Sequence, residues 1–202
     1  FIGRAAKRIS EDPLRIMRAI RFKNHLGFIY HPDTARAIKK AVGQGYVELI
    51  AVDRLRTEIT SLLTHPSRRH ALADLDEFGI LDRILPEVTA GKRVEQPPQF
   101  HAEGDVWQHE LLILDYLPPY PSPRLAWAAL LHDIGKGPTS IKPHKPSDRI
   151  RFNRHYAVGA EMAKTVLKRL KFSTRDQKAI AWIIYNHMGI DNLPAMRPSR
   201  QQ

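Results

Sequence analysis

Four histidines and one aspartate in the second half of the chain have the residue types and spacing of a metal site. The adjacent pair His132 and Asp133 follows His109 along the chain, and His155 and His187 come later. Adjacent residues on a helix point about 100° apart, so the pair can reach one ion from neighbouring directions. Imidazole nitrogens with a carboxylate and no thiolate suit a divalent ion such as Mg, Mn, Ni, Fe or Zn. Each histidine alone is more simply explained as a core or surface residue, but the whole set at expected helix ends favours a metal.

Such an ion would give the chain hydrolytic chemistry on phosphates. A metal held by few protein ligands keeps water, acidifies it and can hold a phosphate oxygen. We therefore predict catalytic roles for His132 and Asp133, and for Lys136, which could meet the negative charge of a substrate. The apolar run at 125–131 would lower the local dielectric and strengthen the attraction of the ion for phosphate.

A second set of polar residues lies near the start of the chain. Asp12 and Arg15 are three residues apart, which makes them neighbours on one face of a helix. Together they offer an acceptor and a fork of donors that can imitate a Watson–Crick edge. An aspartate that caps the helix beside a solvated arginine explains the pattern equally well. Arg54, with Glu58 four residues later, could contact a nucleotide or brace its own helix.

These residues are expected on helices, because almost every segment has helical period and the fold class is therefore all-α. Ser10 or Asp12 is the predicted N-cap of the first helix, with Pro13 at its first position. Asp33 or Thr34 is the predicted cap of the next. The predicted helices occupy residues 10–28, 31–42, 53–65, 67–85, 106–117, 125–131, 155–170 and 174–188, the fourth broken at Gly79 and ended by Pro86.

Two segments without helical period divide the chain. Residues 91–105 contain glycine and a proline pair, which is typical of a linker, so we expect helical units at 1–90 and 106–202. Residues 136–154 form a polar loop, and a loop this long inside a compact unit is usually functional or mobile. His101 in the linker could orient a ligand or have no role, and His144 in the loop is expected to contact solvent.

Composition narrows the possible partners. The 202 residues contain no cysteine, which excludes disulfides and thiolate metal sites. We find no apolar run that could span a bilayer and no secretory leader, so we expect no membrane partner and a cytoplasmic location. The formal net charge of +11 favours a polyanion, above all nucleic acid, although a basic protein without such a partner has the same composition.

The stretch "HDIGKG" at 132–137 resembles the HD superfamily of metal-dependent phosphohydrolases. The resemblance implies that His109, His132 and Asp133 are metal ligands. It also implies that His155 and His187 are the extra histidines of members with expanded sites. Asp191 is the only acidic residue after His187, and its context differs from that of the later family aspartate. We expect that last ligand beyond Gln202, and therefore a weak site.

The order of motifs over nearly the whole chain resembles class II CCA-adding tRNA nucleotidyltransferases and poly(A) polymerases. "SEDPLRIMRAIRF" is similar to their Glu-Asp-x-x-Arg region, and "VDRLRTEITSLL" is similar to the following helix, with Asp53 where the family usually has Glu. The resemblance implies that Asp12 and Arg15 select CTP or ATP, with Arg54 nearby, and that tRNA or another RNA is the partner. CCA addition and A-tailing fit equally well.

The residues for nucleotide addition itself are expected before Phe1. Nucleotidyl transfer needs a glycine-rich turn and paired carboxylates for two metals. The chain has no Gly-Gly, and its only Asp-x-Asp, Asp74 to Asp76, lies in a helical pattern. We expect the chain alone not to add nucleotides. The alternatives are a stand-alone HD phosphohydrolase acting on nucleotides and a basic RNA-binding helical module without activity.

Overall fold

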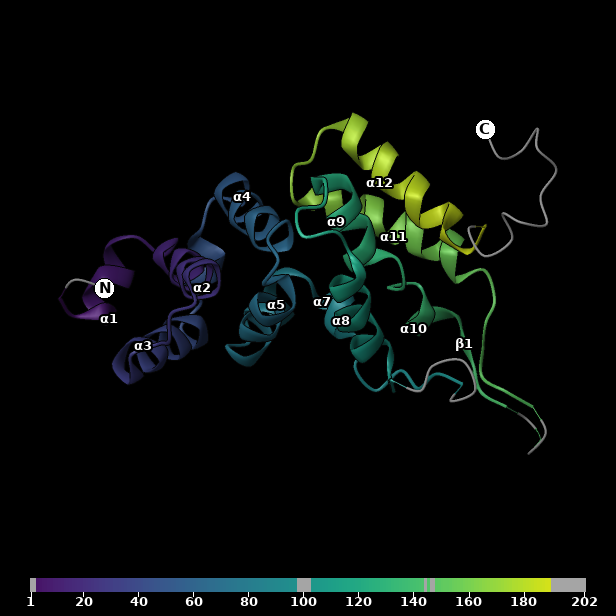
Figure 1. Ribbon diagram of the computed structural model, residues 1–202, viewed down its shortest axis with the longest axis horizontal. Helices are drawn as coiled ribbons and strands as arrows, with labels where there is room; N and C mark the ends of the chain where they lie inside the picture. The colour runs from purple at the N-terminus through teal and green to yellow at the C-terminus, as the bar shows by residue number, and fades with distance from the viewer. Residues whose placement is uncertain (1–2, 98–102, 144, 146–147, 190–202) are drawn as a thin grey trace.

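The computed structural model describes residues 3–97, 103–143, 145 and 148–189, and its fold is all-α, as predicted (Figure 1). The only sheet in these residues is a two-stranded antiparallel hairpin. The elements in chain order are α1 (Ala5–Glu11), α2 (Arg15–Leu26), α3 (Pro32–Gly43), the 3-10 helix η1 (Val47–Leu49), α4 (Val52–Leu63), α5 (Arg68–Glu77), α6 (Ile80–Ile84), α7 (Pro86–Thr89), α8 (Val106–Tyr116), α9 (Pro123–Leu131), α10 (Lys136–Thr139), β1 (Ser140–Ile141), β2 (Arg151–Phe152), α11 (His155–Arg169) and α12 (Thr174–Asn186).

The start of the chain differs from the prediction of one helix beginning at Ser10 or Asp12. Residues 5–11 form the separate helix α1, and Asp12 ends it in an extended conformation. The Asp12 carboxylate then accepts a hydrogen bond from the Leu14 backbone N–H at 3.2 Å, and its carbonyl accepts one from Arg15 N–H at 3.0 Å. This local turn replaces the predicted continuous helix, because an aspartate side chain readily bonds the backbone two residues on.

Other helix ends agree with the sequence in part. Gly79 has a φ of 72° and breaks the fourth predicted helix into α5 and α6. Pro86 ends α6 but also begins the short helix α7. The cap of α3 is neither Asp33 nor Thr34, because the His31 ring Nδ1 accepts the Asp33 N–H at 3.2 Å.

The polar loop at 136–154 contains structure that periodicity did not indicate. It begins with α10 and continues into β1, which pairs with β2 in the register Ser140 to Phe152 and Ile141 to Arg151. In Figure 1 this hairpin extends away from the helical body beside α10. Only two residues of each strand pair, too few for a period-two signal.

The helices on both sides of residues 91–105 pack into one apolar core. Trp127 of α9 is fully buried and donates its Nε1–H to Thr60 Oγ1 of α4 at 2.9 Å. Arg68, at the start of α5 and 3 % exposed, donates to the carbonyls of Leu114 and Pro118 at 3.0 and 2.7 Å. The predicted boundary therefore does not coincide with a gap in the core. Within the described residues, each helix is too short or too polar to cross a bilayer.

Candidate metal centre

The end of α9 is held against the start of α11. Ser122 caps α9 by accepting the Leu125 N–H, and Pro123 follows at the first helical position. Six apolar residues of α9 are buried, and the chain turns immediately after them at His132. Gly135 allows the turn to approach α11, since a Cβ there would lie 2.6 Å from Gly159 N and would also overlap the His155 carbonyl oxygen. The local sequence thus delivers His132 and Asp133 to a helix–helix contact.

Asp133 is the centre of the cluster and is only 1 % exposed. Its Oδ2 lies 3.1 Å from His132 Nε2 and 3.5 Å from His109 Nε2. Its Oδ1 lies 3.3 Å from His155 Nε2 and 3.8 Å from His187 Nε2. Ligands about 2 Å from a shared ion lie within about 5 Å of one another. Each of the four predicted histidines therefore lies within that distance of Asp133, and His109, His132 and Asp133 lie within it of one another.

The far nitrogen of each ring is held by an acceptor, which decides where the lone pair points. A neutral ring that donates through Nδ1–H has its lone pair on Nε2, and metal-binding histidines are commonly fixed in this way. His109 Nδ1 lies 2.6 Å from Glu103 Oε1. In the other three rings Nδ1 bonds the backbone carbonyl three residues earlier, at 2.8 Å for His132, 2.9 Å for His155 and 2.6 Å for His187. These carbonyls belong to Ala129, Phe152 and Ile184. All four Nε2 atoms consequently face Asp133.

This donor set fits a divalent cation. Asp133 Oδ1 is buried and has no hydrogen-bond partner among the described residues. The ligand atoms form two groups around it, His109 with His132 and Asp133, and Asp133 with His155 and His187, with the atoms of each group within 4.8 Å of one another. Ring nitrogens that converge on a carboxylate need a positive charge among them, and a divalent ion could add to the charge that Lys136 and a proton on His132 supply.

The pKa shifts in the cluster show how its buried charges balance one another. Burial opposes charge on both members of the His132–Asp133 pair, but their mutual attraction raises the pKa of His132 well above its usual value and lowers that of Asp133. A proton on His132 Nε2 thus balances Asp133, and a metal would displace that proton on binding. Burial lowers the pKa of His187 to about 4, so this ring is neutral at pH 7 and offers its lone pair.

Lys136 lies inside the cluster rather than at its mouth. It is 5 % exposed, and its Nζ lies 2.7 Å from Asp133 Oδ2 and 2.6 Å from Gln96 Oε1. The structure therefore shows a role in balancing Asp133, and its predicted contact with a substrate anion stays a prediction.

Three residues that surround the cluster were not predicted from the sequence. Glu103 and Gln96 hold His109 and Lys136, yet both belong to the segment interpreted as a linker because of its glycine and proline content. Glu110 is 1 % exposed, lies 3.5 Å from His132 Nδ1, and burial raises its pKa to about 7. A carboxylate directly after His109 within an apolar helix was the one available signal for it.

The predicted nucleotide-reading residues are arranged differently from the expectation. Asp12 and Arg15 do not share a helix face, since the chain turns between them. Asp12 Oδ2 lies 3.4 Å from Arg54 Nη2, whereas Arg15 Nη1 bonds Glu11 Oε2 at 2.9 Å. Of the two alternatives for Arg54, bracing through Glu58 is not what the structure has, because Glu58 pairs with Arg21 at 2.7 Å.

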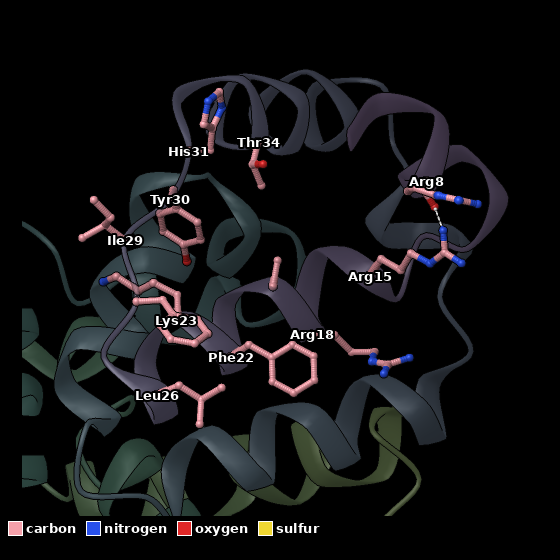
Figure 2. Close-up of a pocket in the computed structure, with 12 residues that line it drawn as sticks. Arg8, Arg15, Arg18, Phe22, Lys23, Leu26, Ile29, Tyr30, His31 and Thr34 are labelled. Atoms are coloured by element: carbon pink, nitrogen blue, oxygen red, sulfur yellow. Dashed lines mark hydrogen bonds between the residues drawn. The ribbon is translucent and has the colours of Figure 1, made fainter. Parts of the chain in front are cut away.

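Arg15 lines a groove of about 960 Å³ together with Arg8 and Arg18 (Figure 2). The apolar part of the same groove comes from the exposed face of α2 and the segment after it, including Phe22 and Ile29. The groove thus combines three guanidinium groups with an apolar wall. Of the other residues considered from sequence, His101, His144 and Asp191 lie outside the described residues.

The chain matches two protein families and is similar to proteins that process tRNA. Residues 27–92 match the family described as "Probable RNA and SrmB- binding site of polymerase A", and residues 113–201 match the HD domain. The chain is 34% identical over 183 residues to an A-adding tRNA nucleotidyltransferase of Deinococcus radiodurans, which covers 88% of this chain and 42% of the relative. It is 32% identical over 192 residues to a multifunctional CCA protein of Nitrosomonas eutropha, and this match covers 94% of this chain and 45% of the relative.

The chain thus spans less than half the length of these curated relatives. A solved structure titled "tRNA-processing enzyme (apo form I)" has the same fold, with a TM-score of 0.50 and 19% identity over 94% of this chain and 44% of that one. The chain therefore combines a region that matches the RNA-binding family of polymerase A with a region that matches the HD domain and contains the histidine–aspartate cluster, and over most of its length it is similar to bacterial tRNA nucleotidyltransferases.

Proposed function

We propose that the chain supplies RNA binding, nucleotide selection and a metal-dependent phosphohydrolase site to a cytoplasmic tRNA nucleotidyltransferase that adds CCA or A residues. The observation that supports the hydrolase site most strongly is the convergence of four histidine Nε2 atoms on the buried Asp133. The names of the relatives support the class of polymerase and tRNA as its partner.

The metal would be held by His109, His132 and Asp133, with His155 and His187 on the other oxygen of Asp133. Mg, Mn, Ni, Fe and Zn all suit nitrogen and oxygen donors of this kind. When bound, such an ion supplies an acidified water and a contact for a phosphate oxygen. The buried α9 wall excludes solvent from the cluster, and Lys136 adds positive charge beside Asp133.

The nucleotide would be read by Asp12, Arg15 and Arg54. The Asp12–Arg54 contact supports an arrangement in which Asp12 accepts while Arg15, on the groove wall, donates. In the enzyme that contains the polymerase head, we expect Arg15→Ala to lower the incorporation of both CTP and ATP. Unchanged incorporation of both nucleotides would restrict Arg15 to its contacts with Glu11 and the Arg8 carbonyl.

The hydrolase site is tested by titrating the purified chain with Mn²⁺ in a calorimeter. We expect saturable binding that Asp133→Ala abolishes, together with loss of hydrolysis of p-nitrophenyl phosphate or of a 2′,3′-cyclic nucleotide. Asp82→Ala, an exposed aspartate of α6, is the matched control and should bind and hydrolyse as the parent does. Equal Mn²⁺ binding by the Asp133→Ala chain would refute the site.

A further inference from the structure

The hairpin that follows the metal cluster is strongly basic. Residues 140–154 contain five cations and one acidic residue, Asp148. All five cationic side chains are exposed, and they are Lys142, Lys145, Arg149, Arg151 and Arg154. Figure 1 shows the strands β1 and β2 lying beside α10, at the edge of the helical body. We call the described part of this segment, residues 140–143, 145 and 148–154, the basic arm.

Three of the five cations of the basic arm have no carboxylate partner among the described residues. Asp148 is bonded to Arg151 Nη2 at 2.6 Å. Within the residues that the structure describes, Lys142, Lys145 and Arg154 form no ion pair with a carboxylate. Along β2 and its approach, half-buried Ile150 alternates with exposed neighbours, so one face of the strand is held against the protein and the other presents arginines.

The basic arm is tied to the metal cluster at its base. The Phe152 carbonyl at the end of β2 accepts the hydrogen bond from His155 Nδ1 at 2.9 Å. The Phe152 ring also lies under Lys136, whose Nζ is 5.5 Å from the ring centroid. Helix α10, which begins at Lys136, leads directly into β1. Anything bound along the arm therefore lies at a defined position beside the cluster.

We propose that the basic arm binds the phosphate backbone of a single-stranded RNA. Resting on the hydrolase function proposed above, this binding would direct the end of the strand towards the metal cluster. Several exposed cations on one hairpin suit a polyanion with repeated phosphates, and neutralised phosphates release counterions. A membrane surface fits less well, because interfacial segments carry large apolar side chains, and on the described arm only Ile141, at 43 %, is an exposed large hydrophobic residue.

The binding step is tested with a triple variant of the whole chain, Lys142→Gln/Lys145→Gln/Arg154→Gln. Anisotropy of a fluorescein-labelled single-stranded RNA is followed as salt is raised. Each phosphate contact contributes about 0.7 to the slope of log K against log salt for a single strand, so the slope should fall by about 2. If the parent and the triple variant bind RNA equally at about 1 M salt, the variant should bind about 100-fold more weakly at about 0.1 M salt.

Lys168→Gln/Arg175→Gln/Lys178→Gln removes the same charge from exposed positions on α11 and α12 and is the matched control. It should stay within a few-fold of the parent. Lys142→Arg/Lys145→Arg should retain both affinity and slope, since charge rather than shape is needed. The proposal would be overturned if the control variant lost as much RNA affinity as the triple variant, or if the triple variant kept the parental salt slope. It would also be overturned if the triple variant kept its affinity for RNA but lost binding to phosphatidylserine vesicles.

Hydrolysis separates this inference from the function on which it rests. The Gln triple variant should cleave p-nitrophenyl phosphate at the parental rate, because that substrate is too small to reach the arm. A chain that binds RNA through the arm but shows no Mn²⁺ binding would refute the hydrolase function and leave the RNA surface standing. Slower p-nitrophenyl phosphate cleavage in the triple variant would instead show that the substitutions disturb the cluster, against the arm as a separate surface.

Discussion

The Nε2 atoms of His155 and His187 lie 3.3 Å apart, although the residues are 32 positions apart in the chain. The first begins α11 and the second follows α12, so the antiparallel packing of these helices creates the contact. Each ring is turned by a local hydrogen bond from Nδ1–H to a carbonyl three residues earlier. The two Nε2 atoms therefore face each other and Asp133 Oδ1, an arrangement that a cation between them would stabilise.

The carboxylate behind His109 should tune metal affinity. Glu103→Gln removes the charge that orients the ring through Nδ1, and hydrogen-bond partners of metal-binding histidines contribute about 10- to 100-fold in affinity. We expect Mn²⁺ titration to show a loss in that range with helical content unchanged. Glu95→Gln, an exposed residue of the same segment, should bind as the parent does. If the Glu103 variant bound Mn²⁺ as tightly as the parent, Glu103 would not contribute to the metal site.

Gly135 should tolerate no side chain. A Cβ at this position would meet the backbone of α11 at Gly159 and His155, and backbone cannot move aside as a flexible side chain can. Gly135→Ala should lower the free energy of unfolding by about 3 kcal/mol. Urea denaturation measures it, with Gly137→Ala as control, because the nearest atom there is a Val94 methyl at 3.8 Å. Similar midpoints for the two variants would contradict the close approach.

Arg68 should be the strongest polar link between the two halves of the chain. It donates to the carbonyls of Leu63, Leu114, Pro118 and Pro119 and has no carboxylate within bonding distance among the described residues. Arg68→Met should cost about 3 kcal/mol in thermal or urea unfolding, because buried carbonyls lose their donor.

The adjacent arginine provides the control for that measurement. Arg69 forms an exposed ion pair with Asp115, and exposed pairs contribute about 0–1 kcal/mol. Arg69→Met should therefore shift the unfolding midpoint little. A loss as large as that of the Arg68 variant would mean that charge, and not the buried carbonyl bonds, stabilises this junction.

Stability should depend on the stacked rings of His25 and His65, whose centroids are 3.9 Å apart. Burial, and then the charge of His65, lower the pKa of His25 below its ordinary 6.5, with a smaller opposing effect from Glu58. The unfolded chain therefore binds the proton more tightly, and this contribution to stability is lost as pH falls below about 6.5. His25→Phe should flatten the decline in melting temperature between about pH 7.5 and pH 5.

The control for the pH measurement is His70→Phe, because His70 lies exposed on α5. It should leave the pH dependence of the melting temperature as it is in the parent. If the His25 variant declines as steeply as the His70 variant, the acid sensitivity arises elsewhere.

Much of the molecule followed from the sequence alone. The helical period of the apolar residues predicted an all-α fold, since one buried stripe per helix is a local property of the chain. The sequence also pointed to the histidines and the aspartate that the structure brings together, because an imidazole and a carboxylate at the end of an apolar helix are costly to bury unless a partner binds them. That they bind a metal stays a prediction. The break at Gly79 could be predicted because it depends on one residue.

The partners of the polar side chains could be learned only from the tertiary structure, because they depend on contacts between distant segments or on a single local hydrogen bond. Glu103 and Gln96 contact the cluster through the fold of a segment whose composition indicates only a linker. The turn at Asp12 separates Asp12 from Arg15 and pairs it with Arg54 instead. Periodicity records which face of a helix is buried, but the side chain that meets a buried donor or charge is chosen by packing, where each polar group must find a partner.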